Sequence, residues 1–233
     1  MDIDDPKITA LKSKVTAAQK EFDMAVTFHE IWKPAAYDQE LHSRLGNSYA
    51  TQAFLVTRTA LRREMVLALV RLWDTNPRGI RMQSIWHDLR DSEVIEAIAL
   101  DRARRLGFMD VLEHMREDLA QKANAALGLI GKYMKGGSHN NVLETLRALR
   151  HERLAHRQLS PTIATGATAT DEEIEELYSD NSRLINTLMG LVNAVAYDPE
   201  DTARVFRYYA TCFWGRFQQN EKTDRLIPAT GDR

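Results

Sequence analysis

The chain has 233 residues, of which 44% are hydrophobic and 27% are charged, and its formal net charge is −2. These values are ordinary for a globular protein, and the net charge excludes the broad basic surface of a protein that coats duplex DNA. The single cysteine, Cys212, excludes a disulfide within the chain and a four-thiolate metal site, so we expect a reducing cytoplasmic location.

Neither a targeting signal nor a membrane span is expected. The N-terminus, Met1 to Asp5, is acidic and is not followed by the apolar stretch of a signal peptide. The longest uncharged apolar run, residues 184–197, is shorter than a membrane span and contains Asn186 and Asn193. The sequence therefore predicts a protein with no membrane partner.

Helix signals recur along the chain, whereas no stretch alternates β-branched and polar residues as a strand does. We predict helices at residues 6–32, 47–73, 92–106, 109–134, 140–157, 171–196 and 200–218. Breaks between them are predicted at Pro34, at Asn76–Gly79, at Gly136–Gly137 and at Ser160–Pro161. The sequence thus predicts an all-α fold.

The chain is predicted to consist of an appended helical arm at 1–46, a bundle domain at 47–218 and a polar tail at 219–233. Helix starts are predicted where Asp5 and Asp198 each precede a proline, because aspartate caps a helix and proline suits its first position. Residues 170–173 are predicted to form a capping box. A similar start is possible at Asn141. The uncharged segment 159–170 is predicted to be a loop.

The predicted helix at 140–157 changes character along its apolar line. That line runs through Val142, Leu146 and Leu149, at steps of four and three. The same spacing continues to Arg153 and His156. The line is therefore expected to open onto something other than a hydrophobic core.

Arg150 and His156 provide a phosphate-binding cation and a proton carrier on that helix. At about 100° per residue they lie roughly 120° apart, so they occupy adjoining faces. We expect a site that uses both to form in a cleft between two copies of the helix, or where its end unwinds. A histidine with a pKa of about 6.5 can take a proton from a ribose 2′-hydroxyl, and an arginine can stabilise charge on the phosphate. Such a pair would cleave RNA without a metal.

These basic residues have two other interpretations. Basic residues near a helix C-terminus also cap carbonyl groups and complement the helix dipole, with no further function. A zinc helix is rejected, because His151 and His156 are five residues apart where the zincin pattern requires four. No metal site and no cofactor are therefore expected.

Residues 150–156, Arg-His-Glu-Arg-Leu-Ala-His, resemble the Arg-x(4–6)-His signature of the HEPN superfamily, in which a polar residue follows the arginine. The context of residues 146–157 and the helix ending Leu72-Trp73-Asp74 most resemble the abortive-infection branch of phage-defence proteins. The resemblance covers roughly residues 47–197. It implies an antiparallel helical bundle, a symmetric homodimer and an endoribonuclease site where two motifs meet.

The resemblance also implies residue roles and partners. Arg150 and His156 would be catalytic, with His151 as their polar neighbour. Independently of the resemblance, we expect Arg153 and Arg157 to contact the RNA substrate. An antitoxin or sensor protein is a possible partner. A branch of the superfamily has a tyrosine two residues after the histidine, where this chain has Gln158, so control by modification of that tyrosine is not inferred. The alternative function is a non-catalytic helical module that binds a nucleotide, RNA or a protein.

Two other groups stand out. Arg58 and Arg63 each interrupt an apolar line of the predicted helix at 47–73, and buried arginine is costly unless it is paired. Each is expected to pair with a carboxylate, such as Asp74 of a symmetry mate, or to line the RNA cleft. Aromatic residues near the C-terminus are expected to pack in the core or in a dimer interface, with base stacking as the alternative. They are Phe206, Tyr209, Phe213, Trp214 and Phe217.

Overall fold

The computed structural model describes residues 5–46, 49–107, 109–150 and 169–216. The α-helices in these ranges are α1 (Pro6–Tyr37), α2 (Gln39–Leu45), α3 (Tyr49–Arg71), α4 (Met82–Leu89), α5 (Ser92–Leu106), α6 (Leu112–Tyr133), α7 (Asn140–Leu149), α8 (Asp171–Leu188) and α9 (Pro199–Trp214). A 3-10 turn, η1 (Met109–Val111), precedes α6, and a π-helical turn, η3 (Met189–Asn193), follows α8. No strand is present in the described ranges, so the predicted all-α fold is confirmed.

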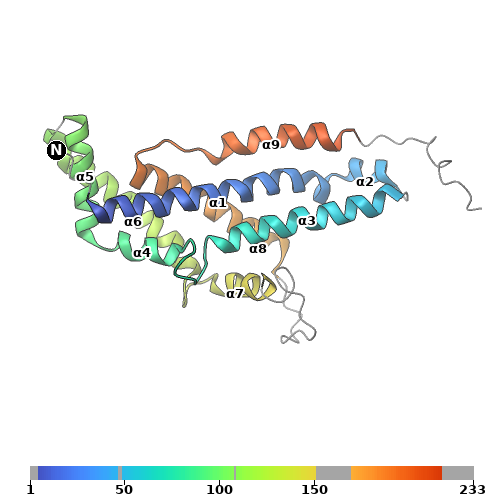
Figure 1. Ribbon diagram of the computed structural model, residues 1–233, viewed down its shortest axis with the longest axis horizontal. Coiled ribbons are helices and arrows are strands. Elements are labelled where there is room, and N and C mark those ends of the chain that lie inside the picture. The colour runs from blue at the N-terminus through green and yellow to red at the C-terminus, as the bar shows by residue number, and fades with distance from the viewer. Residues whose placement is uncertain (1–4, 47–48, 108, 151–168, 217–233) are drawn as a thin grey trace, which may run out of the picture.

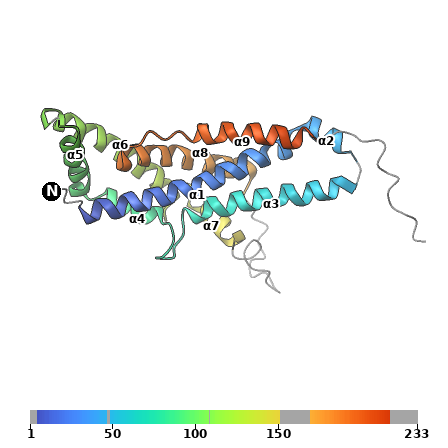
Figure 2. The same cartoon turned by 45° about the horizontal axis from the view of Figure 1, so that its top comes forward.

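Three long helices set the shape of the molecule. α1 lies between α3 and α9 and contacts both along its length (Figure 1 and Figure 2). α1 and α3 run in opposite directions and are connected through α2. α8 packs against α6 and α1, and the short α7 packs against α3 and α6. This arrangement places the end of α7 beside the C-terminal half of α3.

The first helix is part of the main core. The sequence predicts residues 1–46 as an appended arm, but the buried residues of α1 belong to the same hydrophobic cluster as those of α3, α6 and α8. Ile8, Leu11, Val15, Ala18 and Phe22 are buried, and they follow one another at steps of three and four. Because that spacing keeps them on one helix face, α1 presents a continuous apolar stripe to the bundle.

The helix starts that the sequence predicts are found. The Asp5 side chain accepts the N–H of Lys7 at 2.8 Å, and Asp198 accepts the N–H of Glu200 at 3.0 Å. Thr170 and Glu173 form the reciprocal hydrogen bonds of a capping box. Each such cap contributes about 1 kcal/mol of stability. α7 differs, because it starts at Asn140 without a side-chain cap.

Several helices differ from the prediction. α1 continues through Pro34 to Tyr37, so the proline lies in the last turn of the helix and removes one backbone hydrogen bond without ending it. α2 and α4 were not predicted, since their seven and eight residues are too few to show a clear period. The buried residues of α4, Met82, Ile85 and Leu89, are spaced as on one helix face. The turn at Asn76–Gly79 is confirmed by the hydrogen bond from the Gly79 N–H to the Asn76 carbonyl, 2.9 Å.

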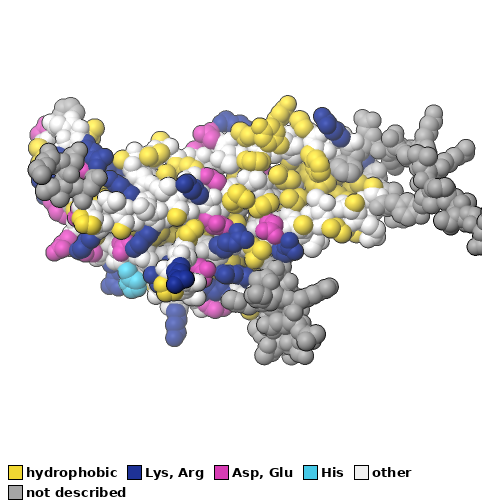
Figure 3. Space-filling view, viewed as in Figure 1, with side chains coloured by type: hydrophobic (Ala, Val, Ile, Leu, Met, Phe, Trp, Pro, Cys, Tyr) yellow, Lys and Arg dark blue, Asp and Glu magenta, His cyan; other side chains and the backbone are white. Residues whose placement is uncertain are grey.

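α9 carries apolar side chains on its outer side as well as its inner side. Trp214 is buried, as expected of a core aromatic residue, whereas Tyr209 and Phe213 are each about half exposed. Tyr208 and Val205 are also exposed, and apolar side chains gather over α9 in Figure 3. Even so, no helix in the described ranges combines the length and the apolar character needed to cross a membrane.

Candidate functional site

α7 brings the predicted Arg150 to the surface beside the end of α3. Val142, Leu143 and Leu146 are buried and fix α7 against the bundle. Arg150 follows the last α-helical residue, Leu149, and its side chain is 25% exposed. The predicted apolar line therefore ends where the predicted site begins.

Asp74 is the carboxylate partner of Arg150. Their closest atoms, Arg150 Nη2 and Asp74 Oδ2, are 3.6 Å apart, and both side chains are about three-quarters buried. This separation is that of an ion pair, longer than a hydrogen bond. Arg150 donates no hydrogen bond to any of the described residues. Its N–H groups therefore lie near the surface without a described acceptor. The sequence analysis predicted Asp74 as a partner for Arg58 or Arg63, and did not predict its pairing with Arg150.

The Asp74 carboxylate is held in its charged form. Partial burial alone would raise the pKa of Asp74, but the backbone N–H groups of Asn76 and Thr75 and the charges of Arg150 and Arg147 lower it below its usual range. The N–H of Asn76 lies 3.1 Å from Asp74 Oδ1. An Asp74 carboxylate that is ionised at neutral pH can therefore fix the position of the Arg150 guanidinium by charge.

The chain segment around Asp74 is anchored to α7 and α8. Arg147 of α7 donates to the backbone carbonyl of Trp73 and also to Glu144, 2.6 Å away. The Trp73 indole N–H donates to the buried side chain of Asn181 in α8, at 3.2 Å. The sequence prediction missed Arg147, although it lies one helical turn before Arg150. Its contact shows that the ends of α3 and α7 are tied together.

The turn after α3 packs closely against Asp74. A Cβ atom at Gly79 would lie 3.1 Å from the Cβ and Oδ2 atoms of Asp74. The Asp74 N–H also donates to the carbonyl of Ile80, at 3.1 Å. Glycine at position 79 therefore leaves room for the carboxylate that faces Arg150.

A second buried carboxylate supports this region from behind. Asp180 of α8 accepts hydrogen bonds from Tyr133 (2.8 Å) and Lys132 (2.5 Å) of α6, and the Tyr133 ring packs against Trp73. Burial raises the pKa of the Tyr133 hydroxyl, and the neighbouring Asp180 raises it further. Tyr133 is thus a fixed hydrogen-bond donor, and this set of contacts serves to position the end of α3.

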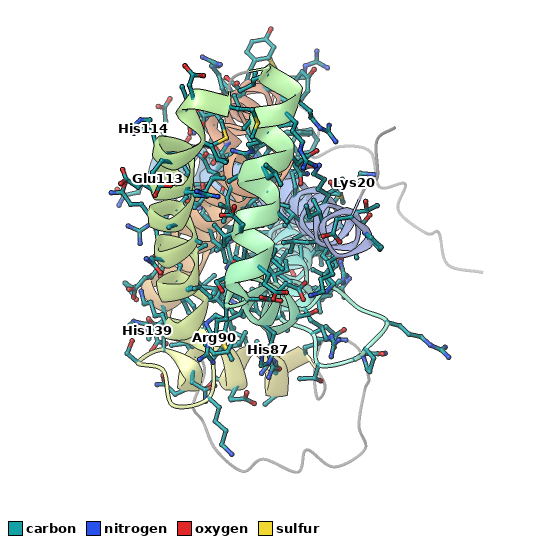
Figure 4. The ribbon with its side chains drawn as sticks, turned by 90° about the vertical axis from the view of Figure 1, so that its left-hand side faces the viewer. Lys20, His87, Arg90, Glu113, His114 and His139 are labelled. Atoms are coloured by element: carbon teal, nitrogen blue, oxygen red, sulfur yellow. The ribbon has the colours of Figure 1, made fainter. Side chains whose placement is uncertain are left out.

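The other histidine and arginine side chains at this end of the bundle contact residues other than Arg150. Figure 4 shows His87, Arg90 and His139 on the side where α7 lies. His139 Nε2 is 3.3 Å from Glu176, and its Nδ1 is 2.8 Å from the Ser138 hydroxyl. The guanidinium of Arg90 lies over the Trp86 ring, 4.5 Å from its centroid. These residues contact α6, α8 or their own helix.

The remaining predicted motif residues, His151, Arg153, His156 and Arg157, lie outside the described residues. The predicted pairing of Arg150 with His156 therefore stays a prediction. Arg58 is described: it is half-buried and lines a pocket with Leu149, the residue directly before Arg150. Arg63 of the same helix pairs with its neighbour Glu64, at 3.0 Å. Within the described ranges, no group of three or more His, Cys, Asp or Glu side chains is placed to hold a metal ion.

A family model described as HEPN_AbiU2 (AbiU2) matches residues 8–210, which is most of the chain. No curated protein and no solved structure matches it.

Proposed function

This chain belongs to the AbiU2 family of HEPN proteins, a HEPN-type abortive-infection family, and we propose that it is a metal-independent endoribonuclease of a phage-defence or toxin–antitoxin system. The observation that carries the proposal is Arg150, held by the ionised Asp74 at the end of α7 with its hydrogen-bond donors free of described partners. The family membership supports the context of defence, and the Arg150 geometry supports phosphate binding.

The proposed reaction is an internal transfer at the RNA phosphate. His156 takes the proton from a ribose 2′-hydroxyl, the 2′-oxygen forms a bond to the adjacent phosphorus, and the bond from phosphorus to the 5′-oxygen breaks. The leaving 5′-oxygen takes up a proton, so the products are a 2′,3′-cyclic phosphate and a free 5′-hydroxyl. Arg150 donates to the phosphoryl oxygens, on which negative charge grows in the transition state.

Cleavage is expected to survive chelation of divalent ions, because the proposed chemistry needs only a proton carrier and a cation fixed by the protein. Purified protein should therefore cut total RNA or transfer RNA in EDTA, and the new ends should be a cyclic phosphate and a 5′-hydroxyl. The ends can be assigned by their response to phosphatase and to polynucleotide kinase. Activity that stops in EDTA and returns with magnesium would contradict the mechanism.

The protein is expected to be a homodimer in which the α7 ends of two copies face each other, because Arg150 and His156 are predicted to lie on adjoining faces of one helix. Light scattering at micromolar concentration should then give twice the mass of the 26.6 kDa chain. A monomer at that concentration would remove the shared cleft from the proposal. An antitoxin or sensor protein that binds the dimer remains part of the proposed system.

Asp74 is proposed as a positioning residue for Arg150. Asp74→Asn removes the negative charge but keeps the size of the side chain, so kcat should fall by about tenfold, since a misplaced catalytic group reduces rate more than binding. KM should change little. The matched control is Glu144→Gln, which removes an exposed carboxylate that faces Arg147 rather than Arg150. Equal losses in both variants would show a general effect on α7 instead.

A further inference from the structure

A pocket of about 460 Å³ opens between α3, the end of α7 and the start of α8. The lining residues are Arg58, Thr59, Arg62, Arg63, Val66, Leu149 and Asp171. The pocket contains three guanidinium groups and one carboxylate, on a chain whose total net charge is −2. It is therefore a local basic site on a protein that has no overall excess of positive charge.

The three arginines differ in how they are neutralised. Arg62 forms an ion pair of 2.5 Å with Asp171, and Arg63 forms one of 3.0 Å with Glu64. Arg58 has neither a hydrogen-bond nor an ion-pair partner in the part of the chain that the structure describes, although it is half-buried beside apolar side chains. A half-buried cation without a counter-charge is unfavourable, so the pocket is suited to an anion that supplies one.

The pocket lies next to the proposed catalytic residue. Leu149, which lines it, directly precedes Arg150. With a rise of about 1.5 Å per residue, Arg62 lies roughly 13 Å and Arg58 roughly 20 Å before Arg71, the last residue of α3, and Asp74 follows shortly after Arg71. The pocket and the Asp74–Arg150 pair therefore lie at successive positions along α3. Phosphates a few nucleotides apart on one nucleic-acid strand can occupy two positions separated in this way.

We propose that this pocket, with Arg58 as its central cation, binds a backbone phosphate of single-stranded RNA a few nucleotides from the phosphate held by Arg150. The proposal rests on the proposed function for the identity of the strand. Guanidinium groups suit this ligand because their planar N–H donors match two phosphate oxygens at once. In the empty pocket Asp171 is paired with Arg62, and an incoming phosphate must compete with this carboxylate for the guanidinium. Asp171 therefore weakens phosphate binding.

The test measures binding without cleavage. The probe is a short fluorescein-labelled oligoribonucleotide with 2′-O-methyl groups, which has no 2′-hydroxyl to attack the phosphate. Its anisotropy is titrated with wild-type protein and variants at several salt concentrations. Arg58→Ala should weaken binding by about tenfold, as for loss of a charged hydrogen bond. The slope of log affinity against log salt should fall by about 0.7, the value for one phosphate contact on a single strand.

Two further variants sharpen the test. Asp171→Asn should bind the probe more tightly than wild type, because it frees Arg62 and removes a repulsive charge. The matched control is Arg204→Ala, which removes a 71% exposed arginine of α9 and should leave both affinity and salt slope unchanged. Opposite signs for Arg58→Ala and Asp171→Asn are not expected from a general loss of stability.

The outcomes separate this inference from the proposed function. If the protein binds the probe through Arg58 but does not cleave RNA, the phosphate site is supported and only the ribonuclease proposal is overturned. Equal affinity of Arg58→Ala and Arg204→Ala overturns the site, whether or not the protein cleaves RNA. If inorganic phosphate displaces the probe as effectively as the unlabelled strand does, the assignment of the ligand to RNA is overturned. The same holds if a duplex competes better than the single strand.

Discussion

Replacement of His156 by alanine should lower the rate of RNA cleavage by about 10²–10⁴-fold, as for loss of a general base. Replacement of Arg150 should lower it by about 10²–10³-fold, as for loss of a donor to the developing negative charge. Both variants should remain folded and dimeric. The rate is measured on a labelled RNA under saturating protein, and the same loss should appear as relief of growth arrest when the variants are overexpressed.

The neighbouring arginines serve as controls for that experiment. Arg153→Ala and Arg157→Ala should weaken RNA binding, yet cleavage should partly survive at saturating RNA because neither residue is proposed to take part in the chemistry. Thermal unfolding followed by circular dichroism checks that all four variants fold. If His156→Ala cleaves normally and melts much earlier than wild type, the histidine is a structural helix cap. The non-catalytic helical module then becomes the better description of the protein.

Local sequence signals predicted much of the fold because helix starts depend on neighbouring residues. Asp5, Asp198 and the capping box at Thr170 bond to N–H groups two or three residues away, so the sequence alone contains both partners. The place of α1 in the core was not predicted. It depends on which helices meet its apolar stripe, and those helices are distant in the sequence.

The candidate site was predicted in part for the same reason. Arg150 was recognised from its own motif and its place on a helix. Its partner Asp74 lies in the turn after α3, and only the packing of α7 against α3 brings the two together. Arg147 and the Trp73 carbonyl meet for the same reason. No periodicity within either segment contains that information.

A buried charged cluster that joins α1, α8 and α9 was also missed by the sequence prediction. His29 of α1 is 2% exposed, and its ring nitrogens lie 3.1 Å from Glu30 and 3.0 Å from Glu175 of α8. Glu30 also accepts a hydrogen bond from Arg207 of α9, at 3.0 Å. The His29 ring stacks on Tyr178, with ring centroids 4.0 Å apart. Two carboxylates facing both nitrogens favour the charged imidazolium.

The pKa shifts in this cluster set the sign of a pH dependence. Burial alone would lower the pKa of His29, but hydrogen bonds and charges from Glu175 and Glu30 raise it above its ordinary 6.5. Burial would raise the pKa of Glu30, yet His29 and Arg207 lower it below its ordinary 4.5. The histidine contribution is fully present below pH 6.5 and is lost as pH rises through the raised pKa. The Glu30 contribution is present above pH 4.5 and is lost as pH falls through the lowered value.

The cluster is therefore expected to stabilise the fold most between about pH 4.5 and 6.5, the ordinary pKa values of the two groups. At pH 6, Glu30→Gln should lower the free energy of unfolding by roughly 3 kcal/mol, because it leaves a buried imidazolium with one carboxylate fewer. That loss should shrink at pH 9, where His29 can release its proton. Urea unfolding followed by circular dichroism at both pH values gives the two free energies.

His29→Gln isolates the histidine's share of that dependence. Wild-type protein should lose more stability than His29→Gln between pH 6 and pH 9, because other titrating groups are common to both proteins and cancel in the comparison. His114→Gln, which changes an exposed histidine of α6, should keep the wild-type dependence. Equal slopes for wild type and His29→Gln would mean that the pKa of His29 is the same in the folded and the unfolded protein. The attraction of Glu30 and Glu175 for the imidazolium would then only offset the cost of its burial.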